Sequence, residues 1–127
     1  MHITRKHFES LTEQALDEIP ARFRTLLHNV EISVRGAPGT ESGRWRGSPY
    51  LLGLYVGLTR DQMLSTGASG HLPARVILYQ RNLERGCADE GRLAAAIRTT
   101  LRHELAHHFG FSDDDLRKKW PEGASKA

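Results

Sequence analysis

The chain has 127 residues, of which 39% are hydrophobic and 26% charged, and its formal net charge is +3 at pH 7. This length and balance fit one soluble globular domain and exclude a disordered chain or two separate cores. The single cysteine, Cys87, excludes an intrachain disulfide and a cysteine-based metal site. The small positive charge does not by itself predict nucleic-acid binding.

The first ten residues, MHITRKHFES, lack the apolar segment of a secretory signal. No apolar run approaches the roughly 18 residues that a membrane span needs. We therefore expect a cytoplasmic protein with no membrane partner. We also expect one domain over residues 1–120, followed by a flexible tail at 121–127.

The first half of the chain predicts a helix and then two strands. Thr4 suits the N-cap of a helix that runs to about Glu18, because one apolar stripe follows it: Phe8, Leu11, Ala15, Leu16 and Ile19. Residues 29–35 alternate between apolar and polar side chains, as in a strand with one buried face. Residues 36–49 are rich in Gly, Ser and Pro and predict a mobile loop. A second alternating segment, 52–58, predicts another strand.

The second half predicts a third strand and two helices. Residues 59–74 predict a loop with a turn of helix near Asp61, and residues 75–81 a strand. Asp89 suits the N-cap of a helix over about 90–108, whose buried stripe would be Leu93, Ile97, Leu101 and Leu105. Ser112 suits the N-cap of a short helix to about Trp120. The elements predict an α+β fold with a mixed sheet of three or four strands against the first helix and the 90–108 helix.

Within the 90–108 helix lies His103-Glu104-Leu105-Ala106-His107, an H-E-x-x-H motif. A spacing of four residues places both histidines on one helix face, where two imidazoles can hold one zinc ion. Glu104 then lies beside the metal and can accept a proton from a metal-bound water.

The motif extends to H-E-x-x-H-x-x-G-x-x-D, with a chance frequency on the order of 1 in 10,000. Gly110 suits a helix that ends in a left-handed residue, and this bend can bring Asp113 round as a third ligand. Asp113 also has an ordinary role in the first turn after the Ser112 cap, and Asp114 is a rival ligand. Three protein ligands with one open position are typical of catalytic zinc.

This motif resembles that of zincin metallopeptidases, and the small size resembles the bacterial minimal-zincin family, which is related to the metzincins. The similarity extends to the opening helix, to Asn29-Val30 and to Leu52-Gly53-Leu54-Tyr55. The resemblance implies a zincin-like domain with one zinc ion held by His103, His107 and Asp113, and with Glu104 as the catalytic base.

The same resemblance implies a peptide or protein substrate that pairs with an edge strand beside the active helix. The 75–81 strand is the candidate, and Tyr79 on it is either a substrate contact or a packed core residue. The chain departs from the metzincins in one respect: Met1 and Met63 both precede the motif, so no Met-turn follows it.

Two other functions stay open. The missing Met-turn and the small size favour a metal-binding or interaction module without useful catalysis. A metal-dependent nuclease is supported only by Arg44-Trp45-Arg46, which can stack on a base. Small metal-dependent ribonucleases lack the Glu after the first His and close the motif with a third His, so we do not expect a nucleic-acid partner. The sequence makes no prediction of the oligomeric state.

Overall fold

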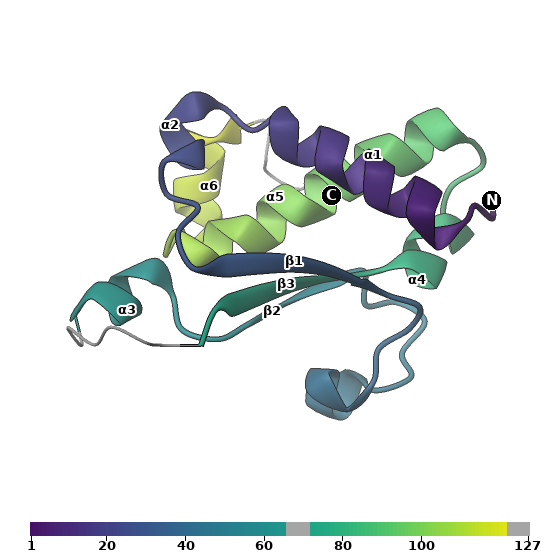
Figure 1. The fold of residues 1–127 in the computed structure, drawn as a ribbon, viewed down its shortest axis with the longest axis horizontal. Coiled ribbons are helices and arrows are strands. Elements are labelled where there is room, and N and C mark those ends of the chain that lie inside the picture. The colour runs from purple at the N-terminus through teal and green to yellow at the C-terminus, as the bar shows by residue number, and fades with distance from the viewer. Residues whose placement is uncertain (66–71, 122–127) are drawn as a thin grey trace.

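The computed structural model describes residues 1–65 and 72–121 of the chain. Figure 1 shows a three-stranded sheet with α1, α2, α5 and α6 gathered on one of its sides. In chain order the elements are α1 (Arg5–Asp17), α2 (Ala21–Arg24), β1 (Val30–Arg35), the 3-10 helix η1 (Thr40–Trp45), β2 (Gly53–Val56), α3 (Arg60–Ser65), β3 (Ala74–Tyr79), α4 (Gln80–Arg85), α5 (Glu90–His108) and α6 (Asp113–Lys119).

The sheet is mixed, which confirms the predicted α+β class. Its order is β1-β3-β2; β1 runs parallel to β3 and β2 runs antiparallel to it. The expectation that the third strand lies at an edge is therefore wrong. Residues 76–79 of β3 are completely buried, as expected for a strand with a neighbour on each side. The free edge nearest the motif belongs to β2.

The third strand also ends earlier than the predicted Arg81. It stops at Tyr79, and the next six residues form α4. A tertiary contact holds this helix to the N-terminal segment: Gln80 Nε2 donates to the Ile3 carbonyl at 3.0 Å. Within α4, the same Nε2 donates to Glu84 Oε2 at 3.0 Å. The alternation of apolar and polar residues does not depend on such contacts, so it predicted a strand that ends two residues too late.

The segment before β2 is more ordered than the mobile loop that its composition predicts. It contains η1, where the backbone N–H of Gly39 donates to Glu41 Oε2 at 2.8 Å and Ser42 Oγ donates to the Gly39 carbonyl at 2.6 Å. The second strand is shorter than the predicted 52–58, and Gly57 follows it with a φ of 120°. That conformation suits glycine and turns the chain away from the sheet.

The helical predictions are confirmed. Thr4 accepts from the backbone N–H of His7 at the start of α1, and Asp89 and Ser112 cap α5 and α6. One turn of helix occurs at α3. The apolar faces of α1 and α5 pack on β1 and β3 to form the core. The fully buried side chain of Trp120, the residue after α6, joins this core.

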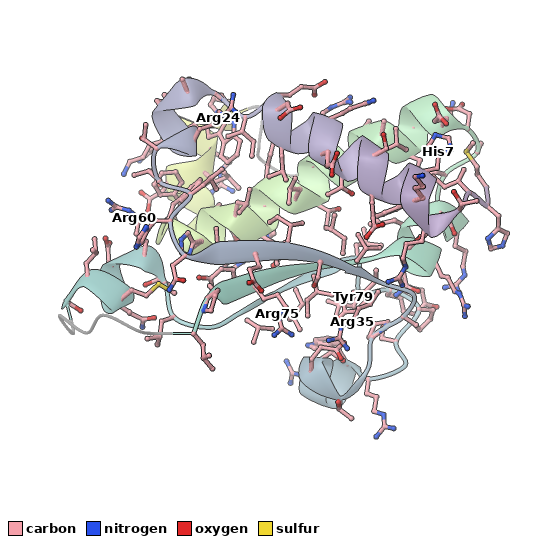
Figure 2. All side chains as sticks on the ribbon, viewed as in Figure 1. His7, Arg24, Arg35, Arg60, Arg75 and Tyr79 are labelled. Carbon is pink, nitrogen blue, oxygen red and sulfur yellow. The ribbon has the colours of Figure 1, made fainter. Side chains whose placement is uncertain are left out.

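The opposite side of the sheet faces η1. Figure 2 shows Arg35, Arg75 and Tyr79 projecting on this side, away from the large helices. Within residues 1–65 and 72–121, no helix combines the length and the apolar character needed to cross a bilayer. The cytoplasmic location and the domain boundary at residue 120 stay predictions, and the expected tail lies outside the described residues from position 122 onward.

Candidate metal centre

Helix α5 sets the position of the motif. It begins where Asp89 Oδ1 accepts from the backbone N–H of Arg92 at 2.8 Å, and it ends at the left-handed Gly110, whose φ is 77°. The predicted apolar stripe of this helix is completely buried: Leu93, Ile97, Leu101 and Leu105. The adjacent helix face, with the two motif histidines, therefore lies at the margin of the core beside β2.

Two imidazoles and one carboxylate meet on that face. The candidate ligand atoms of His103, Glu104 and His107 all lie within 4.8 Å of one another. The centroids of the two imidazole rings are 5.5 Å apart, and His107 Nε2 lies 4.0 Å from Glu104 Oε1. The spacing of four residues thus brings the groups together as the sequence indicates.

These groups fit a divalent cation such as zinc. Imidazole nitrogen and carboxylate oxygen are ordinary zinc ligands. His103 Nδ1 is buried and has no hydrogen-bond partner among the described residues. An unpaired buried nitrogen costs free energy, which a bound cation or its water would relieve. The side chain of His107 is 53% exposed, so an ion can reach the group from solvent.

Asp113 does not belong to this group of ligand atoms within the described chain. It is the first residue of α6 and is exposed, after a capping box formed by Ser112 and Asp115. The rival, Asp114, is engaged elsewhere, with Lys118 Nζ at 2.9 Å and Arg117 Nη2 at 3.6 Å from its carboxylate. The role of Asp113 as third ligand therefore stays a prediction. The ion pairs of Asp114 make Asp114 the less suitable of the two candidates.

The side chain of Glu104 projects from α5 toward the free edge of β2. Burial raises the pKa of its carboxyl group, while His107, His103 and a hydrogen bond from the backbone N–H of Tyr55 act to lower that pKa. Tyr79 N–H donates to the Leu52 carbonyl at 3.0 Å, so Leu52 turns its backbone toward β3. In an antiparallel pair, Gly53 and Tyr55 must then turn their backbone groups outward, toward Glu104.

Gly53 allows the helix to approach the strand this closely. A Cβ at this position would lie 2.7 Å from Thr100 Cγ2 and 3.3 Å from Glu104 Cγ. Any side chain there would push α5 away from β2 or displace the carboxylate. The glycine is thus a requirement of the site.

The buried His108 and its half-buried partner Tyr55, which lie behind the site, were not predicted as functional residues from the sequence. His108 is completely buried; its Nδ1 lies 2.7 Å from the Tyr55 hydroxyl and its Nε2 lies 2.8 Å from the His28 carbonyl. The rings of Tyr55 and His107 stack with centroids 6.2 Å apart. The signal for His108 in the sequence was its place next to His107, which a polar surface explained equally well.

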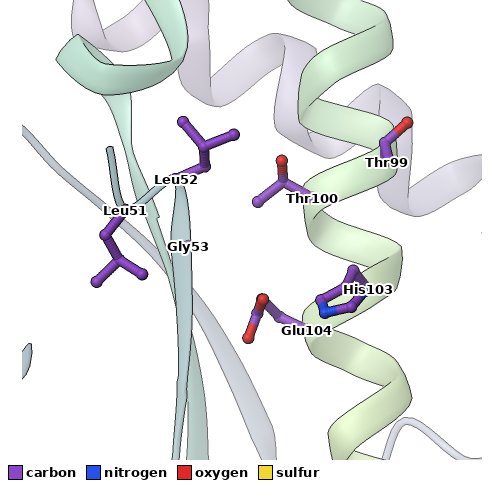
Figure 3. Close-up of a pocket in the computed structure, with 7 residues that line it drawn as sticks. All are labelled: Leu51, Leu52, Gly53, Thr99, Thr100, His103 and Glu104. Carbon is purple, nitrogen blue, oxygen red and sulfur yellow. The ribbon is translucent and has the colours of Figure 1, made fainter. Parts of the chain in front are cut away.

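A cavity of about 260 Å³ adjoins the motif. Figure 3 shows its walls: Gly53 at the start of β2, Leu51 and Leu52 just before it, and Thr99, Thr100, His103 and Glu104 from the helix. The threonines lie one turn before His103, so helical spacing alone would have found them.

Tyr79 is not part of this cavity. It is completely buried, and its hydroxyl donates to Glu41 Oε2 at 2.8 Å on the η1 side of the sheet. Burial and the Glu41 carboxylate raise the pKa of this tyrosine. Of the two roles expected for Tyr79, the geometry favours the packed core residue over the substrate contact.

Comparisons with known proteins address the family and the fold of this chain. The sequence model of a family described as zincin-like metallopeptidase matches residues 27–121. Among solved structures, the fold is similar to that of a conserved hypothetical protein from Thermo thermophilus, with a TM-score of 0.54 and 22% identity over 84% of this chain and 94% of that chain. No protein with a curated function matches this sequence.

Proposed function

The chain belongs to the zincin-like metallopeptidase family, and from this premise we propose that it is a zinc-dependent peptidase that acts from the α5–β2 groove. The observation that carries the proposal is the convergence of His103, Glu104 and His107 within 4.8 Å, beside a strand edge with outward backbone groups. A metal group can activate water and a strand edge can hold an extended peptide, so together they suit metal-assisted hydrolysis of a peptide bond.

In this proposal His103 and His107 hold one zinc ion, and Asp113 completes the ligand set. Bound zinc supplies polarisation of the scissile carbonyl and lowers the pKa of water from 15.7 toward about 7. The surroundings of His103 support its role, because its buried Nδ1 has no competing hydrogen bond among the described residues.

Glu104 is the general base. Its carboxylate accepts a proton from water as the water oxygen bonds to the carbonyl carbon, and it then passes this proton to the leaving nitrogen as the C–N bond breaks. The backbone N–H of Tyr55 orients the carboxylate, and its burial raises the pKa of the group, which favours proton acceptance.

The substrate lies along β2. The Tyr55 N–H is occupied by Glu104, but the outward backbone groups of Gly53 and the outward carbonyl of Tyr55 are available to an extended chain. Such main-chain pairing accepts many sequences. This assignment replaces the 75–81 strand, because β3 already has a partner on both sides.

The test combines metal analysis with a peptide-library cleavage assay. Purified protein should contain one zinc per chain, and H103A should lose it, whereas H7A, which removes a surface histidine paired with Glu90, should keep it. E104Q should keep zinc and lose turnover. If E104Q cleaves a confirmed substrate at the wild-type rate, the role of Glu104 is wrong. If the protein binds zinc and cleaves no peptide in the library, it is instead a metal-binding module.

A further inference from the structure

A second cavity continues the groove beyond the metal centre. It has a volume of about 450 Å³ and lies between the segment that leads into β2 and helix α4. It shares one wall, Leu52, with the cavity beside Glu104. Its lining is Pro49, Tyr50, Leu52, Asn82, Arg85 and Gly86.

The walls of this second cavity are held in place by a buried amide. Asn82 is 5% exposed, and its Nδ2 donates to the carbonyls of Ser48 at 2.9 Å and Leu51 at 2.8 Å. These two hydrogen bonds hold the segment that precedes β2 against α4. Arg85 Nη1 in turn donates to the Pro49 carbonyl and to Asn82 Oδ1, each at 3.3 Å. The guanidinium group is thereby placed at the cavity wall.

The charge in this cavity is uncompensated. No aspartate or glutamate lines it, and Arg85 forms no ion pair with the described residues. Only Nη1 of the guanidinium has a partner there, which leaves its other N–H groups for a ligand. Tyr50, 86% exposed, and Leu52 supply apolar surface beside it. A planar guanidinium beside an apolar wall is suited to a carboxylate, which it can bind through two parallel hydrogen bonds.

We propose that this cavity is a carboxylate subsite, in which Arg85 binds a side-chain or C-terminal carboxylate of the peptide that occupies the β2 edge. The proposal rests on the peptidase function above and names its preferred substrate class. The chain from Leu52 back to Pro49 spans roughly 10 Å in extended form. The carboxylate should therefore lie two or three residues from the scissile bond.

The experiment measures binding, so that it does not depend on turnover. Three pools of dye-labelled octapeptides differ in one carboxylate and are otherwise built from uncharged residues. The first pool has an amidated C-terminus and no carboxylate, the second has one internal Glu and an amidated C-terminus, and the third has a free C-terminus. Fluorescence anisotropy on zinc-loaded E104Q protein should show about fivefold to tenfold tighter binding of at least one carboxylate pool. The pool that gains affinity identifies the source of the carboxylate.

Adding R85Q to the E104Q protein should remove the tighter binding of the carboxylate pool. The affinity for the amidated neutral pool should stay unchanged. R85K, which keeps the charge and loses the planar fork, should keep part of the tighter binding. The matched control is R81Q, because Arg81 lies on the same helix but lines a different cavity with His2 and Glu84. Equal binding of all pools, or an equal loss in R85Q and R81Q, would overturn the subsite. Cleavage of the pools by wild-type protein is scored separately, so a failure of the peptidase function is distinguishable from a failure of the subsite.

Discussion

The hydroxyl of Tyr55 lies 2.7 Å from Nδ1 of His108, and this contact joins β2 to the last turn of α5 directly behind the two motif histidines. The same hydroxyl lies 2.5 Å from the Leu58 carbonyl, so one proton serves two acceptors. Burial raises the pKa of Tyr55 to about 12, which keeps that proton in place at neutral pH. The pair therefore sets how the end of α5 sits against the strand.

Removing this hydroxyl should destabilise the fold without changing the candidate ligands His103 and His107. We expect Y55F to lower the free energy of unfolding by about 1 kcal/mol, because a buried acceptor on His108 loses its partner. Urea denaturation monitored by circular dichroism measures the change. The control is Y50F, since Tyr50 is 86% exposed, and it should match wild type. A Y55F protein as stable as wild type would show that the contact contributes nothing.

The stability of the metal-free protein should fall as the pH is lowered below neutrality. Burial lowers the pKa of His108 from 6.5, against a hydrogen bond with the His28 carbonyl that acts to raise it. The unfolded chain then binds a proton more readily than the folded one, so stability is fully present above pH 6.5 and is lost as the pH falls toward the folded pKa. Urea denaturation at pH 7.5 and 5.5, in the presence of a chelator, tests this. H108Q should flatten the dependence, and H7Q should not.

A methyl group at Gly53 should disturb the site more than the fold. We expect G53A to cost about 1 to 3 kcal/mol, because its Cβ would lie 2.7 Å from Thr100 Cγ2. It should also impair peptide cleavage, because the added Cβ would lie 3.3 Å from Glu104 Cγ and would displace the carboxylate. Thermal unfolding and the library assay measure the two effects.

Two variants sharpen the Gly53 test. T100S removes the clashing methyl, so G53A/T100S should recover part of the stability lost in G53A. G36A is a neutral glycine control, because its nearest contact would be Arg81 Nε at 3.6 Å. An unaltered G53A protein would mean that α5 and β2 are not held in the close contact described.

The third ligand can be identified by zinc titration. D113N should weaken zinc binding by about tenfold or more, because it replaces a charged ligand with a neutral amide. D114N should leave the affinity unchanged, since Asp114 already pairs with Arg117 and Lys118. Competition with a chromogenic chelator gives both affinities. The reverse order would assign the ligand to Asp114.

The local pattern of the sequence determined helices α1, α5 and α6, their N-caps and the class of the fold. Asp89 and Ser112 were identified as N-caps because a short polar side chain before an apolar stripe has few other uses. The spacing of His103 and His107 determined that their rings share a face, because the period of an α-helix is a fixed property of the backbone. These features depend on residues a few positions apart, so the sequence by itself was sufficient.

The tertiary structure alone decided which strand borders the site and what surrounds the motif. The alternation in residues 75–81 predicts a strand but not its neighbours, and pairing with β1 and β2 placed it in the centre, with Tyr79 turned toward Glu41. Gly53 opposite Thr100, and Tyr55 beside His108, join segments about fifty residues apart. Such contacts depend on the packing of the whole chain, which no local period of apolar residues encodes.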